Sequence, residues 1–118
     1  MYILDSSAFI RGYTKEGHTA TVAEVSGELF GEARLRFEAM RGRGMQIQVP
    51  QEKTVEEVIQ IAKKTGDSTV ISRTDICLIA AAIELEGVLV TDDYAMQNIA
   101  AEIGLRFEGI AMEKIKEK

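Results

Sequence analysis

Two acidic positions follow short apolar runs that have the character of buried strands. Asp5 comes directly after Tyr2-Ile3-Leu4, and the pair Asp92 and Asp93 comes one residue after Val88-Leu89-Val90. In an open parallel sheet, ligands bind outside the carboxyl ends of the strands. If the two strands are parallel neighbours, these acids should emerge at the same edge of the sheet.

Two further acids are expected near that edge. Asp75 closes the sequence Ser72-Arg73-Thr74-Asp75, which is typical of a helix start with a capping box. Glu28 is expected inside an earlier helix, with Glu24 four residues before it on the same face. Four or five carboxylates from distant parts of the chain could therefore converge.

Converging carboxylates raise one another's pKa and repel, so such a cluster needs a cation. Mg²⁺ and Mn²⁺ prefer carboxylate and water oxygens, commonly together with phosphate oxygens of a substrate. Ions of this kind can activate water and stabilise the leaving oxygen of a phosphodiester. The chemistry that this pattern predicts is metal-dependent hydrolysis of a nucleic-acid backbone.

Each acid also has a simpler explanation. Asp5, Asp92 or Asp93 could cap a helix, Asp75 could complement a helix dipole, and Glu28 could be part of a solvated helix face. Taken together these explanations are weaker. Ser6 and Ser7 could cap the first helix as well as Asp5, and one acid instead of two would suffice after the second strand.

Other catalytic classes lack the residues that they need. His18 is the only histidine and Cys77 the only cysteine, so the chain can form neither an intrachain disulfide nor a Cys/His zinc cluster. His18 is expected in a solvated loop, which leaves a Ser-His-Asp or Cys-His arrangement little to work with. Cys77 fits a small buried packing residue, and no Gly-rich nucleotide motif is present.

The apolar spacing predicts the elements that would position the acids. We expect strands at Tyr2 to Leu4, around Ile47 to Val49, at Val88 to Val90 and at Leu105 to Phe107. Gly12 to Thr19 should be a loop. One or two helices are expected over Ala20 to Met40, and single helices over residues 52–64, over 72–86 with Gly87 as the stop, and from Asp93 through Ile103. Residues 112–118 form a charged tail.

Strands that alternate with helices indicate an α/β fold: three layers, α/β/α, around a central parallel sheet of four or five strands. The length of 118 residues and the 46% apolar content fit a single domain over residues 1–118. No apolar run approaches the ~20 residues of a membrane span. The expectation is a soluble, cytoplasmic protein without a membrane partner.

The net charge of −5 argues against RNA binding by bulk electrostatics alone. The charge is uneven, however. Residues 31–44 carry four arginines (Arg34, Arg36, Arg41 and Arg43) against two glutamates, a local balance of +2 that leaves −7 for the remainder. These arginines, together with Lys63 and Lys64, are candidates for steering phosphates toward the site, although a solubilising helix face explains them equally well.

The motifs together resemble those of the PIN domain nucleases: Asp after the first strand, a helical Glu, Ser-x-x-Asp at Ser72 to Asp75, and Thr-x-Asp at Thr91 to Asp93. A narrower resemblance is carried by Lys63-Lys64-Thr65-Gly66-Asp67 and by Thr91-Asp92-Asp93-Tyr94-Ala95-Met96-Gln97-Asn98, which is similar to the Nob-type endonucleases of ribosome assembly.

The resemblance implies catalytic, metal-binding roles for Asp5, Glu28, Asp75 and Asp93, with Asp92 as an additional metal ligand and Glu24 as the competitor of Glu28. It also implies that Ser6, Ser72 and Thr91 orient the carboxylates. Nob-type proteins continue into a zinc ribbon, for which this sequence has no cysteine pairs. The chain is then either an isolated PIN domain or a relative that has lost the ribbon.

The leading hypothesis is a Mg²⁺- or Mn²⁺-dependent endoribonuclease that cuts single-stranded RNA. Its substrate would be precursor ribosomal RNA in the pre-small-subunit particle, matured at its 3′ end. The first alternative is a toxin-type PIN ribonuclease paired with an antitoxin, and the second is a catalytically weak PIN scaffold in ribosome assembly. A homodimer would be common for the fold, but the sequence alone does not predict one.

Overall fold

The computed structural model describes residues 1–13 and 17–110. The expected charged tail, residues 112–118, lies outside them, as does the middle of the expected loop from Gly12 to Thr19. The described elements are, in order, β1 (Tyr2–Leu4), α1 (Ser6–Ile10), β2 (Thr19–Thr21), α2 (Ala23–Ser26), α3 (Gly31–Gly42), β3 (Gln46–Ile47), α4 (Glu52–Thr65), α5 (Arg73–Leu85), β4 (Val88–Val90), α6 (Tyr94–Ile103) and β5 (Phe107–Glu108).

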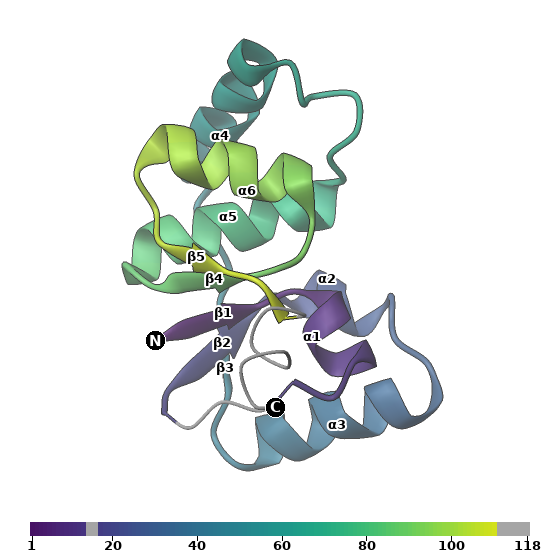
Figure 1. Ribbon diagram of the computed structural model, residues 1–118. Helices are drawn as coiled ribbons and strands as arrows, with labels where there is room; N and C mark the ends of the chain where they lie inside the picture. Colours follow the sequence, from purple (N-terminus) through teal and green to yellow (C-terminus); the bar gives the residue numbers. More distant parts are fainter. Residues whose placement is uncertain (14–16, 111–118) are drawn as a thin grey trace.

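The five strands form one parallel sheet in the order β3-β2-β1-β4-β5. The chain first moves from β1 out to β3, then returns to β4 beside β1 and moves on to β5. Because parallel crossovers are right-handed, this reversal places the connecting helices on opposite faces. Figure 1 shows the result, with α4, α5 and α6 on one side of the sheet and α1 and α3 on the other. The predicted three-layer α/β/α fold is confirmed.

The core lies on both faces of the central strands. Ile3, Leu4, Leu89 and Val90 are almost completely buried. Helix α5 packs against β1, β4, α4 and α6, and its residues Cys77 to Ala82 are all buried. Continuous burial explains why this helix looks apolar on every side in the sequence. Within the described residues, no helix is long and apolar enough to cross a membrane.

The expectation of helical structure from Ala20 to Met40 is wrong for its first residues. Thr19 to Thr21 form strand β2, paired with both β1 and β3, so the expected loop ends before Thr19. The periodic apolar positions from Val22 onward mimicked a longer helix. Thr19, Ala20 and Thr21 lack the continuous apolar run that marks β1 and β4, so only the pairing partners of this strand define it.

Smaller differences concern the ends of elements. The strand expected around Ile47 to Val49 is β3, which covers Gln46 and Ile47 only. Strand β5 begins at Phe107 instead of the expected Leu105. Helix α5 ends at Leu85. The residue that caps its end in the left-handed conformation (φ 51°) is Glu86, not the expected Gly87. Gly87 serves a different purpose, since a Cβ there would lie 2.9 Å from the backbone oxygen of Met1. The glycine lets the chain enter β4 directly alongside β1.

Candidate active site at the carboxyl ends of β1 and β4

The point where the chain reverses its direction through the sheet lies between β1 and β4. These strands are parallel neighbours, with Leu4 opposite Val90. A crevice forms outside the carboxyl ends of strands at such a switch point. Asp5 follows β1, and Thr91 with Asp92 and Asp93 follows β4, so the two acidic positions singled out first in the sequence lie at the same edge of the sheet.

Asp5 is 6% exposed and is held from two sides. As the N-cap of α1, its Oδ1 accepts hydrogen bonds from the backbone N–H of Ser7 (2.9 Å) and from the Ser7 hydroxyl. Its Oδ2 accepts a hydrogen bond from the Thr91 hydroxyl. Burial raises the pKa of the Asp5 carboxyl, while these hydrogen bonds act in the opposite direction. Ser7, rather than the predicted Ser6, supplies the contact.

Thr91 connects Asp5 to Asp93. Its buried hydroxyl donates to Asp5 and accepts a hydrogen bond from the backbone N–H of Asp93 at 3.0 Å. The carbonyl of Thr91 accepts a bond from the side-chain amide of Gln97 (2.9 Å). Asp93 caps α6, because its Oδ1 accepts from the backbone N–H of Met96 at 3.0 Å. Thr91 therefore has the geometry expected of a hydroxyl that orients two acids.

Asp75 is half-buried at the start of α5. It forms a capping box with Ser72, whose hydroxyl accepts from the Asp75 N–H at 3.1 Å while Asp75 Oδ2 accepts from the Ser72 N–H at 3.3 Å. Burial raises the pKa of the Asp75 carboxyl, and the negative charges of Asp93 and Glu28 raise it further, against the effect of the Ser72 hydrogen bonds. Three acids from three separate segments thus share one electrostatic environment.

Glu28 and Glu24 are separated by the structure. Glu28 is exposed in the turn after α2 and is not helical, because α2 ends at Ser26 and α3 begins only at Gly31. Glu24 lies within α2 and faces Cys77, with the Cys77 Sγ 3.5 Å from its Oε2. Burial, followed by the charge of Glu24, raises the pKa of the Cys77 thiol. Of the two glutamates, Glu28 is the one whose charge contributes to the raised pKa of the Asp75 carboxyl.

Asp92 is held by other partners. Its Oδ1 accepts a hydrogen bond from the backbone N–H of Ile110 at 2.6 Å, and its Oδ2 pairs with the guanidinium of Arg11 at 3.0 Å. These contacts fix the segment after β5 and the end of α1 to the end of β4. The arrangement favours a structural role for Asp92 over the predicted one as a metal ligand.

The donor chemistry suits a hard divalent cation. Asp5, Asp75, Asp93 and Glu28 offer carboxylate oxygens only, and the mutual repulsion felt at Asp75 is what a bound cation would relieve. In the described ranges, however, no three His, Cys, Asp or Glu side chains are already close enough together to hold an ion. The acids face a common region without forming a closed set of ligands.

The four predicted RNA-binding arginines of α3 differ in their surroundings. Arg36 donates to the backbone oxygen of Phe9 at 2.8 Å, so it caps the end of α1. Arg34 donates to the backbone oxygen of Ser26 at 3.3 Å and spans the turn between α2 and α3. Arg41 and Arg43 are exposed near the end of α3.

Two contributors to the site were missed by sequence reasoning. Arg11 has no motif around it, and only the packing of α1 beside β4 reveals its pairing with Asp92. The buried Thr21 donates its hydroxyl to the Leu4 carbonyl at 2.7 Å, tying the end of β2 to the residue before Asp5. Because strand β2 was not expected from the sequence, nothing in the pattern marked Thr21 as a residue near the site.

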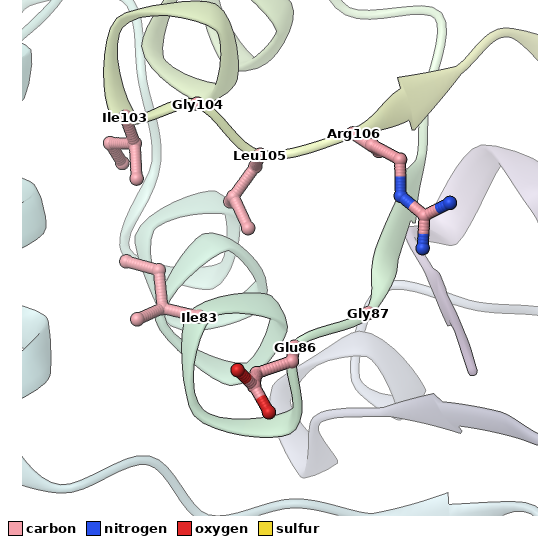
Figure 2. Close-up of a pocket in the computed structure, with 7 residues that line it drawn as sticks. All are labelled: Ile83, Glu86, Gly87, Ile103, Gly104, Leu105 and Arg106. Carbon is pink, nitrogen blue, oxygen red and sulfur yellow. The ribbon is translucent and has the colours of Figure 1, made fainter.

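A separate hollow lies at the opposite edge of the sheet. Figure 2 shows it between the end of α5 and the segment from α6 to β5, lined largely by the aliphatic side chains of Ile83, Ile103 and Leu105. The charged groups there are Glu86 and Arg106. It lies at the amino ends of β4 and β5, away from the acids.

Comparison with known proteins gives consistent results. The family model described as "PIN domain of ribonuclease" matches residues 2–85. Endoribonuclease Nob1 of Archaeoglobus fulgidus is 36% identical, covering 100% of this chain and 73% of the relative. Endoribonuclease Nob1 of Methanocaldococcus jannaschii is 35% identical (94% and 57%), and ribonuclease VapC1 of Thermoplasma acidophilum is 30% identical (98% and 60%).

The crystal structure of FitAcB from Neisseria gonorrhoeae resembles the chain in fold, with a TM-score of 0.59 at 14% identity over 91% of this chain and 96% of that one. The chain spans less than two thirds of the length of two of these three relatives. The family model covers most of the chain and the relatives cover nearly all of it: the chain belongs to the PIN domain family of ribonucleases and is a relative of the archaeal Nob1 proteins.

Proposed function

We propose that the chain is an endoribonuclease that depends on Mg²⁺ or Mn²⁺ and cuts single-stranded RNA. One observation carries the proposal. Asp75, at the start of α5, lies within the electrostatic range of Asp93 and Glu28. Asp93 is in turn joined through the Thr91 hydroxyl to the buried Asp5 at the sheet's switch point. Perturbed carboxyls that gather at such a crevice are typical of functional sites.

In this proposal Asp5, Asp75, Asp93 and Glu28 would hold the ion or ions. A bound ion of this kind supplies Lewis-acid chemistry for phosphodiester hydrolysis. The protein contributes rigid placement: the Thr91 hydroxyl fixes Asp5, and the Ser72 capping box fixes Asp75. Glu28 offers an exposed carboxylate from the turn after α2.

The proposed substrate is the 3′ region of precursor small-subunit ribosomal RNA, processed in the cytoplasm. It is supported by the similarity to endoribonuclease Nob1 of two archaea over 94% or more of the chain. The similarity to ribonuclease VapC1 over 98% of the chain supports a second candidate, a toxin-type ribonuclease that acts on transfer or messenger RNA.

The test is cleavage of end-labelled single-stranded RNA that spans the 3′ end of small-subunit ribosomal RNA, beside transfer RNA and messenger RNA, with Mn²⁺ or with EDTA. Asp75→Asn keeps the size of the side chain and removes its charge. Glu102→Gln is the matched control, because Glu102 is a surface acid of α6 that pairs with Lys64 at 3.8 Å.

We expect Mn²⁺-dependent cutting near the mature 3′ end, abolished by Asp75→Asn and retained by Glu102→Gln. Cutting confined to transfer or messenger RNA would favour the toxin-type enzyme. Cutting in EDTA, or unchanged cutting by Asp75→Asn, would overturn the proposed metal site. Absence of cutting on every RNA would favour a scaffold.

A further inference from the structure

The aromatic side chains of this protein divide sharply by exposure. Phe9, Tyr13 and Phe37 are buried, Tyr2 is partly buried, and Phe107 is 39% exposed. Phe30 and Tyr94 are 83% and 82% exposed. A single exposed aromatic residue needs no explanation. Phe30 and Tyr94 do need an explanation, because both lie within two residues of a proposed metal-binding acid.

Tyr94 is the first residue of α6 and follows Asp93 directly. The next two residues, Ala95 and Met96, are buried, and Asp93 is fixed as the N-cap of the helix. The helix start is therefore anchored, and the Tyr94 ring projects into solvent from a rigid base next to a proposed metal ligand.

Phe30 lies two residues after Glu28. It follows the buried Leu29 and precedes Gly31, whose φ of +56° turns the chain into α3. Arg34, one helical turn further on, bonds the Ser26 carbonyl at 3.3 Å and braces this turn. The Phe30 ring is exposed at a braced position, with a cationic side chain nearby.

The packing of α5 places the two rings around one region. The Cys77 Sγ lies 3.5 Å from the Glu24 carboxylate, so α2, which leads to Phe30, contacts α5, the helix whose first turn carries Asp75. Helix α5 also packs against β4 and α6, and Tyr94 is the first residue of α6. Figure 1 shows the start of α6 and the connection from α2 to α3 at the same edge of the sheet, where β1 and β4 end.

We propose that Tyr94 and Phe30 are stacking platforms for unpaired RNA bases on either side of the phosphate bound at the acids. Proteins that bind single strands combine cationic groups for the backbone with aromatic rings for the bases, and stacking contributes strongly to affinity. The inference rests on the proposed function. It explains how a chain with a net charge of −5 could hold RNA without a strongly basic surface.

The test separates binding from cleavage. The chain has no tryptophan, so Tyr94→Trp introduces a single indole at the proposed platform, which can be excited selectively over the remaining tyrosines. Tyr94→Trp, with its four acids intact, is titrated with short oligouridine and oligoadenine in the presence of Ca²⁺, which also takes carboxylate ligands, and with an abasic strand of equal charge. Stacking quenches indole fluorescence, whereas phosphate contact alone does not.

We expect quenching by the two oligonucleotides and none by the abasic strand. In fluorescence-polarisation assays with the same labelled RNA, Tyr94→Ala and Phe30→Ala should each weaken binding by about fivefold or more, and Tyr94→Phe should restore it. Phe107→Ala is the matched control, because Phe107 lies with Tyr2 and Val88 at the amino ends of the strands. It should leave the affinity unchanged.

Two results would overturn the inference: equal quenching by the abasic strand, or RNA affinities of Tyr94→Ala and Phe30→Ala equal to that of Phe107→Ala. In the latter case the two rings form a surface for a protein partner. These outcomes are distinct from failure of the proposed function. Base-dependent quenching without cleavage by the wild type would support the stacking platforms and reject the nuclease activity. Cleavage without quenching would support the nuclease activity and reject the stacking platforms.

Discussion

At the residue scale, the site depends on Thr91 as much as on the acids. Its hydroxyl donates to the Asp5 carboxylate and accepts from the Asp93 backbone, and it is completely buried. A buried polar group that loses its partner costs more free energy than the bond itself contributes. Replacement of this hydroxyl should therefore affect both folding and the placement of the acids.

Thr91→Val keeps the shape of the side chain but leaves one Asp5 oxygen and the Asp93 N–H without that partner. We expect the free energy of unfolding to fall by roughly 1–3 kcal/mol and RNA cleavage to fall with it. Urea denaturation and the cleavage assay measure the two effects. Thr91→Ser retains the hydroxyl and should preserve most of the activity; equal losses for Ser and Val would contradict the proposed bridge.

The raised pKa of the Asp75 carboxyl also has a consequence for stability. Since the folded state binds this proton more readily than the unfolded state, ionised Asp75 lowers stability at neutral pH, and that cost disappears as the pH falls through the raised value. In EDTA, Asp75→Asn should thus be more stable than the wild type at pH 7.

The difference between the two proteins should shrink on acidification toward the ordinary pKa of an aspartate. Denaturant titrations from pH 7 to pH 4 would follow it. An advantage of Asp75→Asn that stays constant or grows as the pH falls would show that the charge of Asp75 is not the cause.

At the scale of elements, α1 is short and relies on its neighbours. It has five residues, which is too few for a helix to be stable alone. Asp5 caps its start, and Arg36 from α3 donates to the Phe9 carbonyl at its end. The guanidinium of Arg36 also lies 3.6 Å from where a Cβ on Gly12 would be, so the turn after α1 fits closely against it.

Arg36→Ala should consequently destabilise the fold by about 1–2 kcal/mol, because a hydrogen bond from a charged group contributes about 1.5–3 kcal/mol and solvent at this partly exposed side chain weakens it. Arg41→Ala, at the exposed end of α3, is the comparison and should change stability by less than about 0.5 kcal/mol. Thermal or urea unfolding of both variants measures this. Similar stabilities for the two would mean that Arg36 is only a surface charge.

At the scale of the whole molecule, the radius of gyration of 13.4 Å is close to the about 13.5 Å expected for one compact body of this length. The fold brings the acids to a single edge from residues as far apart as 5 and 93. A cation that binds them therefore binds the native state and not the unfolded chain.

Mn²⁺ should for that reason raise the melting temperature, with a stabilisation of about 2.7 kcal/mol when the ion is present at 100 times its Kd. Asp75→Asn should reduce the shift strongly and Glu102→Gln should not. Differential scanning calorimetry in Mn²⁺ and in EDTA gives the comparison. A shift of equal size in all three proteins would indicate nonspecific binding to the acidic surface.

The sequence by itself determined those features that are local. The helices α4, α5 and α6 were predicted to within two residues at each end, because apolar spacing, the Ser72 capping box and the stops at Gly66 and Gly104 act within a few residues. The same local rules placed Asp5, Asp75 and Asp93 at the ends of strands and the starts of helices.

Tertiary structure decided what depends on partners distant in the chain. Strand β2 exists through its pairing with β1 and β3, and Glu28 lies near Asp75 from a turn instead of a helix. Asp92 and Asp93 are adjacent and identical in type, yet Arg11 and Ile110 engage the first while the second caps α6. Spacing specifies which acids reach the edge of the sheet, and packing determines which of them face one another.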